Sequence, residues 1–166
     1  MSPVNLTDPS FNTTPYETLQ AYGRSKSASN LFTVELNNRA KKYNVLAFSL
    51  HPGSIGGTEL AREATFEQFQ QMGFCDAQGN ILPEIAAKLK SIPQGAATTV
   101  WCAVCPLLEN YGGVYCEDCN IAPLIGPNSA ATIGVNGVEP YSLNEDLAWK
   151  LWYLSEKMTG VAFLNN

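Results

Sequence analysis

Residues 45–53 read Val-Leu-Ala-Phe-Ser-Leu-His-Pro-Gly, a short apolar run that ends abruptly in a proline and a glycine. An apolar run of this length, bounded by turn residues, is typical of a parallel strand that is buried on both faces. A long helix is expected before it, over about 15–43, because an interrupted apolar stripe runs through that segment and basic residues gather at its end. A helix that leads into a buried parallel strand indicates an α/β fold.

The rest of the chain continues this alternation. Four further helices are expected, over about 59–72, 83–90, 93–105 and 144–159. A brief second strand is expected at 112–116, and residues 1–14, rich in Pro, Asn, Thr and Ser, predict a loop. Two strands cannot form a doubly wound sheet, so the pattern predicts the C-terminal half of one. We expect about two strands with flanking helices, forming a partial Rossmann-like domain over 15–166.

The composition is that of a folded globular protein. The 166 residues fit one domain, with 45% hydrophobic and 15% charged residues. A formal charge of −5 argues against nucleic acid or an anionic membrane as a partner. No apolar run approaches the roughly 20 residues of a membrane span, and the N-terminus has no signal-peptide pattern. Together with an odd number of cysteines, five, this predicts a cytoplasmic protein.

A tyrosine and a lysine, Tyr22 and Lys26, are candidates for acid–base chemistry. Four residues apart on the expected helix, they share one face. A tyrosine ordinarily titrates near pH 10, so as a base at neutral pH it needs a nearby positive charge, which Lys26 can supply. The same spacing also occurs by chance, as a half-buried tyrosine beside a solvated lysine on a surface helix.

The loop that follows the first strand is a candidate ligand site. It begins at His51-Pro52-Gly53, at the carboxyl end of a buried parallel strand, where α/β folds bind ligands. Glycines in such a loop let the backbone approach a ligand closely. Thr58 could either cap the next helix or donate a hydrogen bond to a ligand. His51 is the only histidine, which rules out a multi-histidine metal site.

Several segments, taken in order, resemble the short-chain dehydrogenases/reductases, most closely the retinol-dehydrogenase-like and WW-domain oxidoreductase-like branch. The segments are Tyr-Gly-Arg-Ser-Lys-Ser-Ala-Ser-Asn at 22–30, His-Pro-Gly-Ser-Ile at 51–55, Gln-Gly-Ala-Ala-Thr at 94–98, Gly-Gly-Val-Tyr at 112–115 and Glu-Asp-Cys at 117–119. Each motif is weak alone, but the ordered set covers nearly the whole chain. The resemblance implies an NAD- or NADP-dependent oxidoreductase that interconverts a hydroxyl and a carbonyl group on a small molecule.

The resemblance also implies roles for individual residues. Tyr22 would be the catalytic acid/base, and Lys26 would bind the nicotinamide ribose and lower the tyrosine pKa. Pro52, Gly53 and Ile55 would line the nicotinamide, and Thr58 would touch its carboxamide or the phosphates. The residues expected to contact the cofactor are thus Tyr22, Lys26, Pro52, Gly53, Ile55 and Thr58.

The chain departs from the family pattern in several places. The glycine-rich phosphate turn, the residue that selects NAD or NADP and the Asn-Asn-Ala-Gly segment are missing. The serine that polarises the substrate carbonyl is missing too, and we expect Ser10 to be only a turn residue after Pro9. The loop from Pro52 to Thr58 is one residue longer than the usual pattern. We therefore expect little or no activity from this chain in isolation.

Two alternatives of other classes remain open. The unpaired edges of so few strands invite association, with another subunit or with a second copy of the chain. Two Cys-x-x-C pairs, Cys102 with Cys105 and Cys116 with Cys119, could also hold a structural zinc ion. Their ten-residue separation is shorter than is common, and the first pair lies in an apolar run that predicts a buried helix.

Overall fold

A computed structural model describes residues 2–56, 58, 65–71, 73–126 and 136–164. Its helices are α1 (Thr18–Ala40), α2 (Phe66–Gln71), α3 (Pro83–Ala86), α4 (Ile92–Val104) and α5 (Glu145–Thr159). Short 3₁₀ turns cover Lys41–Tyr43, Pro106–Leu108 and Pro140–Leu143. The strands are β1 (Ser49–His51), β2 (Tyr115–Glu117) and β3 (Asn120–Ile121).

The three strands form one sheet in the order β1-β2-β3. Strands β1 and β2 are parallel, with Ser49 opposite Tyr115 and His51 opposite Glu117, as expected for the two strands that the sequence predicts. Strand β3 was not predicted; it pairs antiparallel with β2 across the two residues Asp118 and Cys119, both of which have positive φ. A two-residue hairpin of this kind carries left-handed residues at both central positions.

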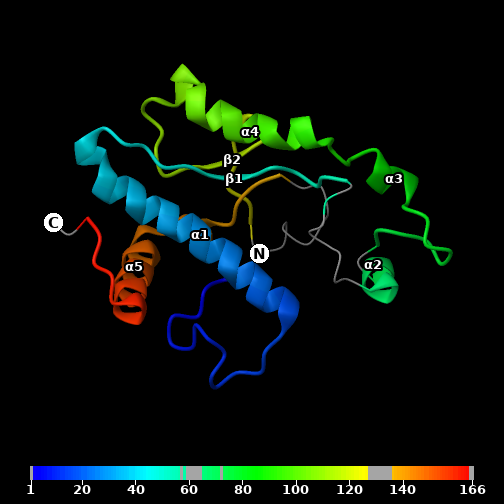
Figure 1. Ribbon diagram of the computed structural model, residues 1–166, viewed down its shortest axis with the longest axis horizontal. Helices are drawn as coiled ribbons and strands as arrows, with labels where there is room; N and C mark the ends of the chain where they lie inside the picture. Colours follow the sequence, from blue (N-terminus) through cyan, green and yellow to red (C-terminus); the bar gives the residue numbers. More distant parts are fainter. Residues whose placement is uncertain (1, 57, 59–64, 72, 127–135, 165–166) are drawn as a thin grey trace.

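Helices cover both faces of the sheet, as in a Rossmann-like fold. Figure 1 shows α4 on one side of the strands and α1 on the other, with α5 packed against α1 on the side away from the sheet. The apolar core between α1 and α5 contains Leu31, Val34 and Ala148. The fold class predicted from the alternation of elements, an α/β Rossmann-like fragment, is therefore confirmed.

The first strand is shorter than its apolar run predicts. The run begins at Val45, but the strand begins only at Ser49. Asn37 of α1 explains part of the difference, because its side-chain oxygen accepts the hydrogen bond of the Ala47 N–H. The Ala47 carbonyl in turn accepts the N–H of Gly113. These backbone groups are satisfied without regular strand pairing.

Each expected helix has a counterpart in the described part of the chain, and some of the bounds differ from those predicted. Helix α1 begins at Thr18 rather than at residue 15, because the Glu17 carboxylate caps it by accepting the N–H groups of Leu19 and Gln20. Helix α3 ends at Ala86, before the expected residue 90, because Lys90 forms a β-bridge with Ile55. The helix expected over 59–72 is α2, with residues 59–64 and 72 outside the described part.

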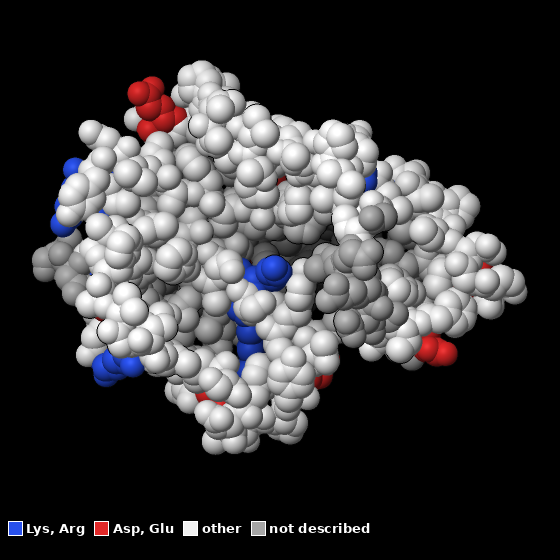
Figure 2. Space-filling model, in the orientation of Figure 1, with Lys and Arg blue, Asp and Glu red and all other residues white. Residues whose placement is uncertain are grey.

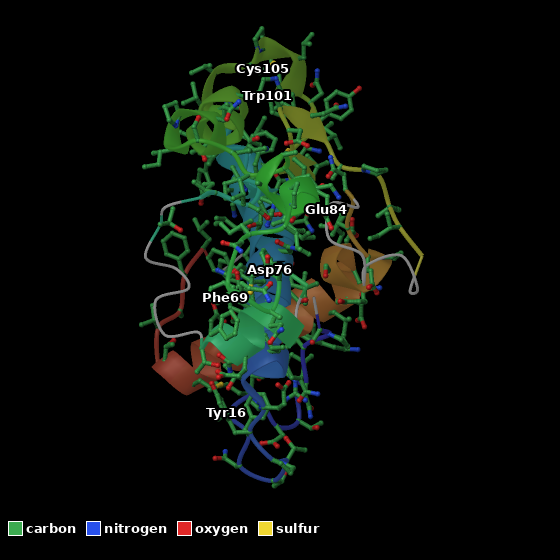
Figure 3. The ribbon with its side chains drawn as sticks, turned by 90° about the vertical axis from the view of Figure 1, so that its right-hand side faces the viewer. Tyr16, Phe69, Asp76, Glu84, Trp101 and Cys105 are labelled. Carbon is green, nitrogen blue, oxygen red and sulfur yellow. The ribbon has the colours of Figure 1, made fainter. Side chains whose placement is uncertain are left out.

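Helices α4 and α5 differ in how closely they match the sequence predictions. Helix α5 matches its predicted bounds, with Asn144 as its cap and Gly160 in a left-handed conformation at its end. Helix α4 lacks charged residues and was expected to be buried, yet Val100 and Val104 are exposed. Figure 3 shows Trp101 and Cys105 at the end of α4, far from Tyr16 near the start of α1. None of the helices in the described ranges is long and apolar enough to cross a membrane.

Candidate functional site

A cleft of about 970 Å³ opens between α1, the carboxyl ends of β1 and β2, and the segment that precedes α5. Figure 2 shows this face hollowed near its middle, with basic side chains at the edge of the hollow. Parallel strands present their carboxyl ends at the same edge of the sheet, so the loops that follow β1 and β2 meet here. The cleft therefore lies where an α/β fold places its ligand.

Tyr22 and Lys26 both line this cleft, on the face of α1 that the four-residue spacing predicts. The Lys26 Nζ lies 5.2 Å from the centroid of the Tyr22 ring, and the tyrosine is 50% exposed. The ammonium therefore stands over the aromatic ring, within the range of a cation–π contact. Both side chains are accessible to a molecule in the cleft.

A second tyrosine–lysine pair in the chain serves as a comparison. Tyr153 and Lys157 have the same four-residue spacing on α5, with Nζ 4.5 Å from the ring centroid and the tyrosine 49% exposed. Neither residue lines the cleft. The contact between ring and ammonium therefore follows from helical spacing alone. What distinguishes Tyr22 and Lys26 is the cleft that they share with the loop after β1.

The loop after β1 brings two of the four predicted cofactor residues from this region into the cleft. Pro52 and Gly53 line it, and Gly53 has a φ of +91°, a conformation that favours glycine. Ile55 is not among the lining residues; its side chain packs against Gly95 at the start of α4. Thr58 is exposed and does not line the cleft either.

Sequence reasoning missed a group of cleft residues along β2. Tyr115 is buried, and Glu117 lies two residues further along the same strand. Burial, reinforced by the negative charge of Glu117, raises the pKa of Tyr115 above its ordinary value, so this phenol stays protonated. These residues could have been found from the rule that parallel strands end at one edge, since 112–116 was predicted to be a strand.

An ion pair crosses the mouth of the cleft. Lys90 is bonded to Asp118, which also accepts a hydrogen bond of 2.8 Å from the Asn136 side chain. The bond from Lys90, followed by that from Asn136, holds the pKa of Asp118 below its usual range. The aliphatic part of Lys90 covers Gly53, because a methyl group placed on Gly53 would come within 2.6 Å of it. Lys90 thus links the loop after β1 to the β2–β3 turn.

One buried polar atom in the cleft has no partner in the structure. The Ser49 Oγ is inaccessible and makes no hydrogen bond, and Ser49 as a whole is 8% exposed. A buried hydroxyl without a partner carries a desolvation cost. The Lys26 ammonium, a hydrogen-bond donor that lines the cleft, fits the hydroxyl-bearing nicotinamide–ribose end of a dinucleotide.

The four cysteines do not form the predicted zinc site. Within the described residues, which include all four, no group of three or more His, Cys, Asp or Glu side chains could hold a metal ion. Burial raises the pKa of the Cys102 thiol, and it raises the pKa of the Cys116 thiol to about 12. A buried, protonated thiol is a small apolar side chain and a poor metal ligand.

Comparison with known proteins identifies relatives over most of the chain, although no family model matches. Short-chain dehydrogenase/reductase prx1 of Penicillium roqueforti is 37% identical over 149 residues, which are 89% of this chain and 40% of that protein. Oxidoreductase calI of Penicillium decumbens is 36% identical over 155 residues, 88% of this chain and 41% of that protein. The WW domain-containing oxidoreductase of Danio rerio is 32% identical over 145 residues, 86% of this chain and 29% of that protein.

A solved structure agrees on the fold. The crystal structure of an uncharacterized protein from Mycobacterium Paratuberculosis matches with a TM-score of 0.50 at 23% identity, over 98% of this chain and 47% of that one. The chain thus spans less than half the length of each of these relatives. It is similar to the C-terminal part of the three sequence relatives, which are named as oxidoreductases and short-chain dehydrogenases/reductases.

Proposed function

We propose that this chain carries the acid/base half of an NAD- or NADP-dependent oxidoreductase that interconverts a hydroxyl and a carbonyl group. The observation that supports this most directly is the shared cleft, in which Tyr22 and Lys26 face the Pro52–Gly53 loop. The Tyr153–Lys157 pair has the same spacing but no cleft, and we assign it no such role.

Each residue has a defined task in this proposal. The nicotinamide, when bound, gives or takes the hydride. The Tyr22 hydroxyl gives a proton to the substrate oxygen, or takes one from it, within hydrogen-bond reach. The Lys26 ammonium donates hydrogen bonds to the ribose hydroxyls. Pro52 and Gly53 form the wall against which the nicotinamide lies, and the finer assignments of Ile55 and Thr58 remain predictions.

Cofactor contact can be tested on the 166-residue chain without any turnover. NADH and NADPH are added separately, and transfer of magnetisation from protein to nicotinamide protons is measured by NMR. We expect weak contact signals that fall at least about fivefold in Lys26→Ala, the loss of one charge-assisted hydrogen bond. Lys157→Ala is the matched control and should leave them unchanged. Equal signals in both variants would contradict the proposed site.

Catalysis by the isolated chain is a separate question. The sequence contains no glycine-rich phosphate turn, so it supplies donors only for the nicotinamide end of the dinucleotide. We therefore propose little or no turnover of carbonyl compounds with NADH or NADPH. Clear turnover that disappears in Tyr22→Phe and persists in Tyr153→Phe would overturn this proposed inactivity while supporting the role of Tyr22.

A second candidate function is association without catalysis. Helix α4 has no charged residue and exposes Val100 and Val104, and within the described residues β1 pairs only with β2. An uncharged, exposed helix face beside an open strand edge is a surface suited to a partner chain.

A further inference from the structure

The single histidine of the chain makes a specific hydrogen bond in the loop after β1. The Gly53 N–H donates to the His51 Nδ1 at 3.1 Å. A ring nitrogen that accepts a hydrogen bond carries no proton, so a neutral His51 must hold its proton on Nε2. The geometry therefore implies one tautomer of the neutral imidazole.

This bond has the pattern of a turn that asparagine and aspartate commonly make. In an Asx turn, a side-chain acceptor bonds to the backbone N–H two residues later. His51 and Gly53 are two residues apart, and Pro52 between them has no N–H to offer. The imidazole thus replaces the carboxamide oxygen of an Asx turn. It secures the first backbone N–H after the strand, at the residue whose φ is +91°.

Other groups around His51 already have partners. Glu117 lies opposite it in the sheet register and accepts the Gly137 N–H at 2.9 Å. Asp118 is bonded to Lys90 and Asn136. Neither carboxylate depends on the imidazole for a hydrogen-bond donor. The hydrogen bond that the structure shows for His51, itself a residue of the cleft lining, is the one from Gly53.

We propose that His51 is a positioning residue: its neutral imidazole holds the Pro52–Gly53 turn in the conformation that lines the cleft. The role given to this turn rests on the proposed function, because the turn is the part of the cleft wall assigned to the nicotinamide. The hydrogen bond itself can be tested independently. Because the chain has one histidine, its imidazole signals need no assignment.

The first experiment, on the full chain, measures the tautomer of His51 and the exchange rate of the Gly53 amide. Long-range proton–nitrogen NMR at a pH where His51 is neutral should show the proton on Nε2. Amide exchange at Gly53 should accelerate about fivefold or more in His51→Ala, the effect of losing one hydrogen bond. Gly56, whose N–H donates to the Lys90 carbonyl in the same loop, is the internal control and should not change.

The second experiment asks whether an Asx turn can replace the imidazole. His51→Asn keeps an acceptor at the right separation, so it should restore slow exchange at Gly53 and also restore the nicotinamide contact signals that His51→Ala weakens. A proton on Nδ1, unchanged Gly53 exchange in His51→Ala, or failure of His51→Asn to rescue it would overturn the proposal. If no variant contacts NADH or NADPH, the proposed function fails, while the tautomer and exchange results still decide the role of His51.

Discussion

Asp8 shows how one side chain organises a segment with no regular structure. It is buried, and its two carboxylate oxygens accept the N–H groups of Asn12, Thr13 and Thr14 and the hydroxyls of both threonines. Burial alone would raise the pKa of Asp8, but the hydrogen bonds from Thr14, Thr13 and the backbone outweigh it and lower the pKa well below its ordinary value. The loop over 8–14 is therefore folded around a carboxylate.

Asp8→Ala should destabilise the chain in a pH-dependent way. Because the folded-state pKa is depressed, the stabilisation is fully present above the unfolded pKa of about 3.9 and is lost as pH falls toward the folded value. The urea midpoint of Asp8→Ala should therefore lie below that of wild type at pH 7, and the difference should shrink in acid. Asp146→Ala, which removes an exposed carboxylate paired with Lys150, is the control and should show little change.

Residue identity alone could not separate the two tyrosine–lysine pairs. Tyr22 with Lys26 and Tyr153 with Lys157 have the same spacing, similar exposure and similar ring-to-ammonium geometry. The ordered family motifs singled out the first pair, because the histidine–proline–glycine loop follows it at the end of a strand. Tyr115 and Ser49 were missed because their importance comes from burial beside the cleft, a property of tertiary packing.

At the scale of elements, the sequence predicted the types of helix and strand better than their ends. Helix α5 was predicted well because Asn144 and Gly160 are strong local signals at its two ends. Strand β1 was predicted too long because a side chain 10 residues away in sequence, Asn37, bonds the Ala47 N–H. Strand β3 was missed because its hairpin has Cys119 at the second central position, where glycine would be the usual signal.

The contact between α1 and α5 depends on one tryptophan. Trp152 of α5 is 4% exposed, stacks on Phe32 with ring centroids 5.1 Å apart and donates its indole N–H to Glu156. Arg39 of α1 lies over the same ring, 4.8 Å from its centroid, and is paired with Glu35. The aromatic ring, the guanidinium and the carboxylates thus join the two helices at one point.

Trp152→Ala should lower the free energy of unfolding by about 3–5 kcal/mol, the usual cost of removing a buried aromatic side chain. Trp149 lies on the same helix but is 53% exposed, so Trp149→Ala should cost less than about 1 kcal/mol. Urea unfolding followed by circular dichroism compares the two variants directly. Similar losses in both would show that the stacked cluster does not hold α5 to α1.

At the scale of the whole molecule, the unusual feature is that α4, a helix without charged residues, has exposed apolar side chains. A helix without charged residues is normally covered on all sides. Here one face lies over the sheet, where Gly95 and Thr98 are buried, while Val104 is 71% exposed. A groove of about 510 Å³ runs beside it, lined by Phe48 and Leu50 and by residues of α4. The apolar helix face and the edge of β1, which in the described part of the chain pairs only with β2, form the candidate contact surface.

We expect this surface to bring two copies of the chain together, and the test is the oligomeric state. Sedimentation over a range of concentrations should show association that Val104→Glu weakens at least about tenfold, because the interface would then bury an unpaired charge. Val161→Glu is the matched control: Val161 is 61% exposed just beyond α5, which Figure 1 shows on the opposite side of α1 from α4. A monomer at every concentration, or equal effects of the two substitutions, would contradict self-association through α4.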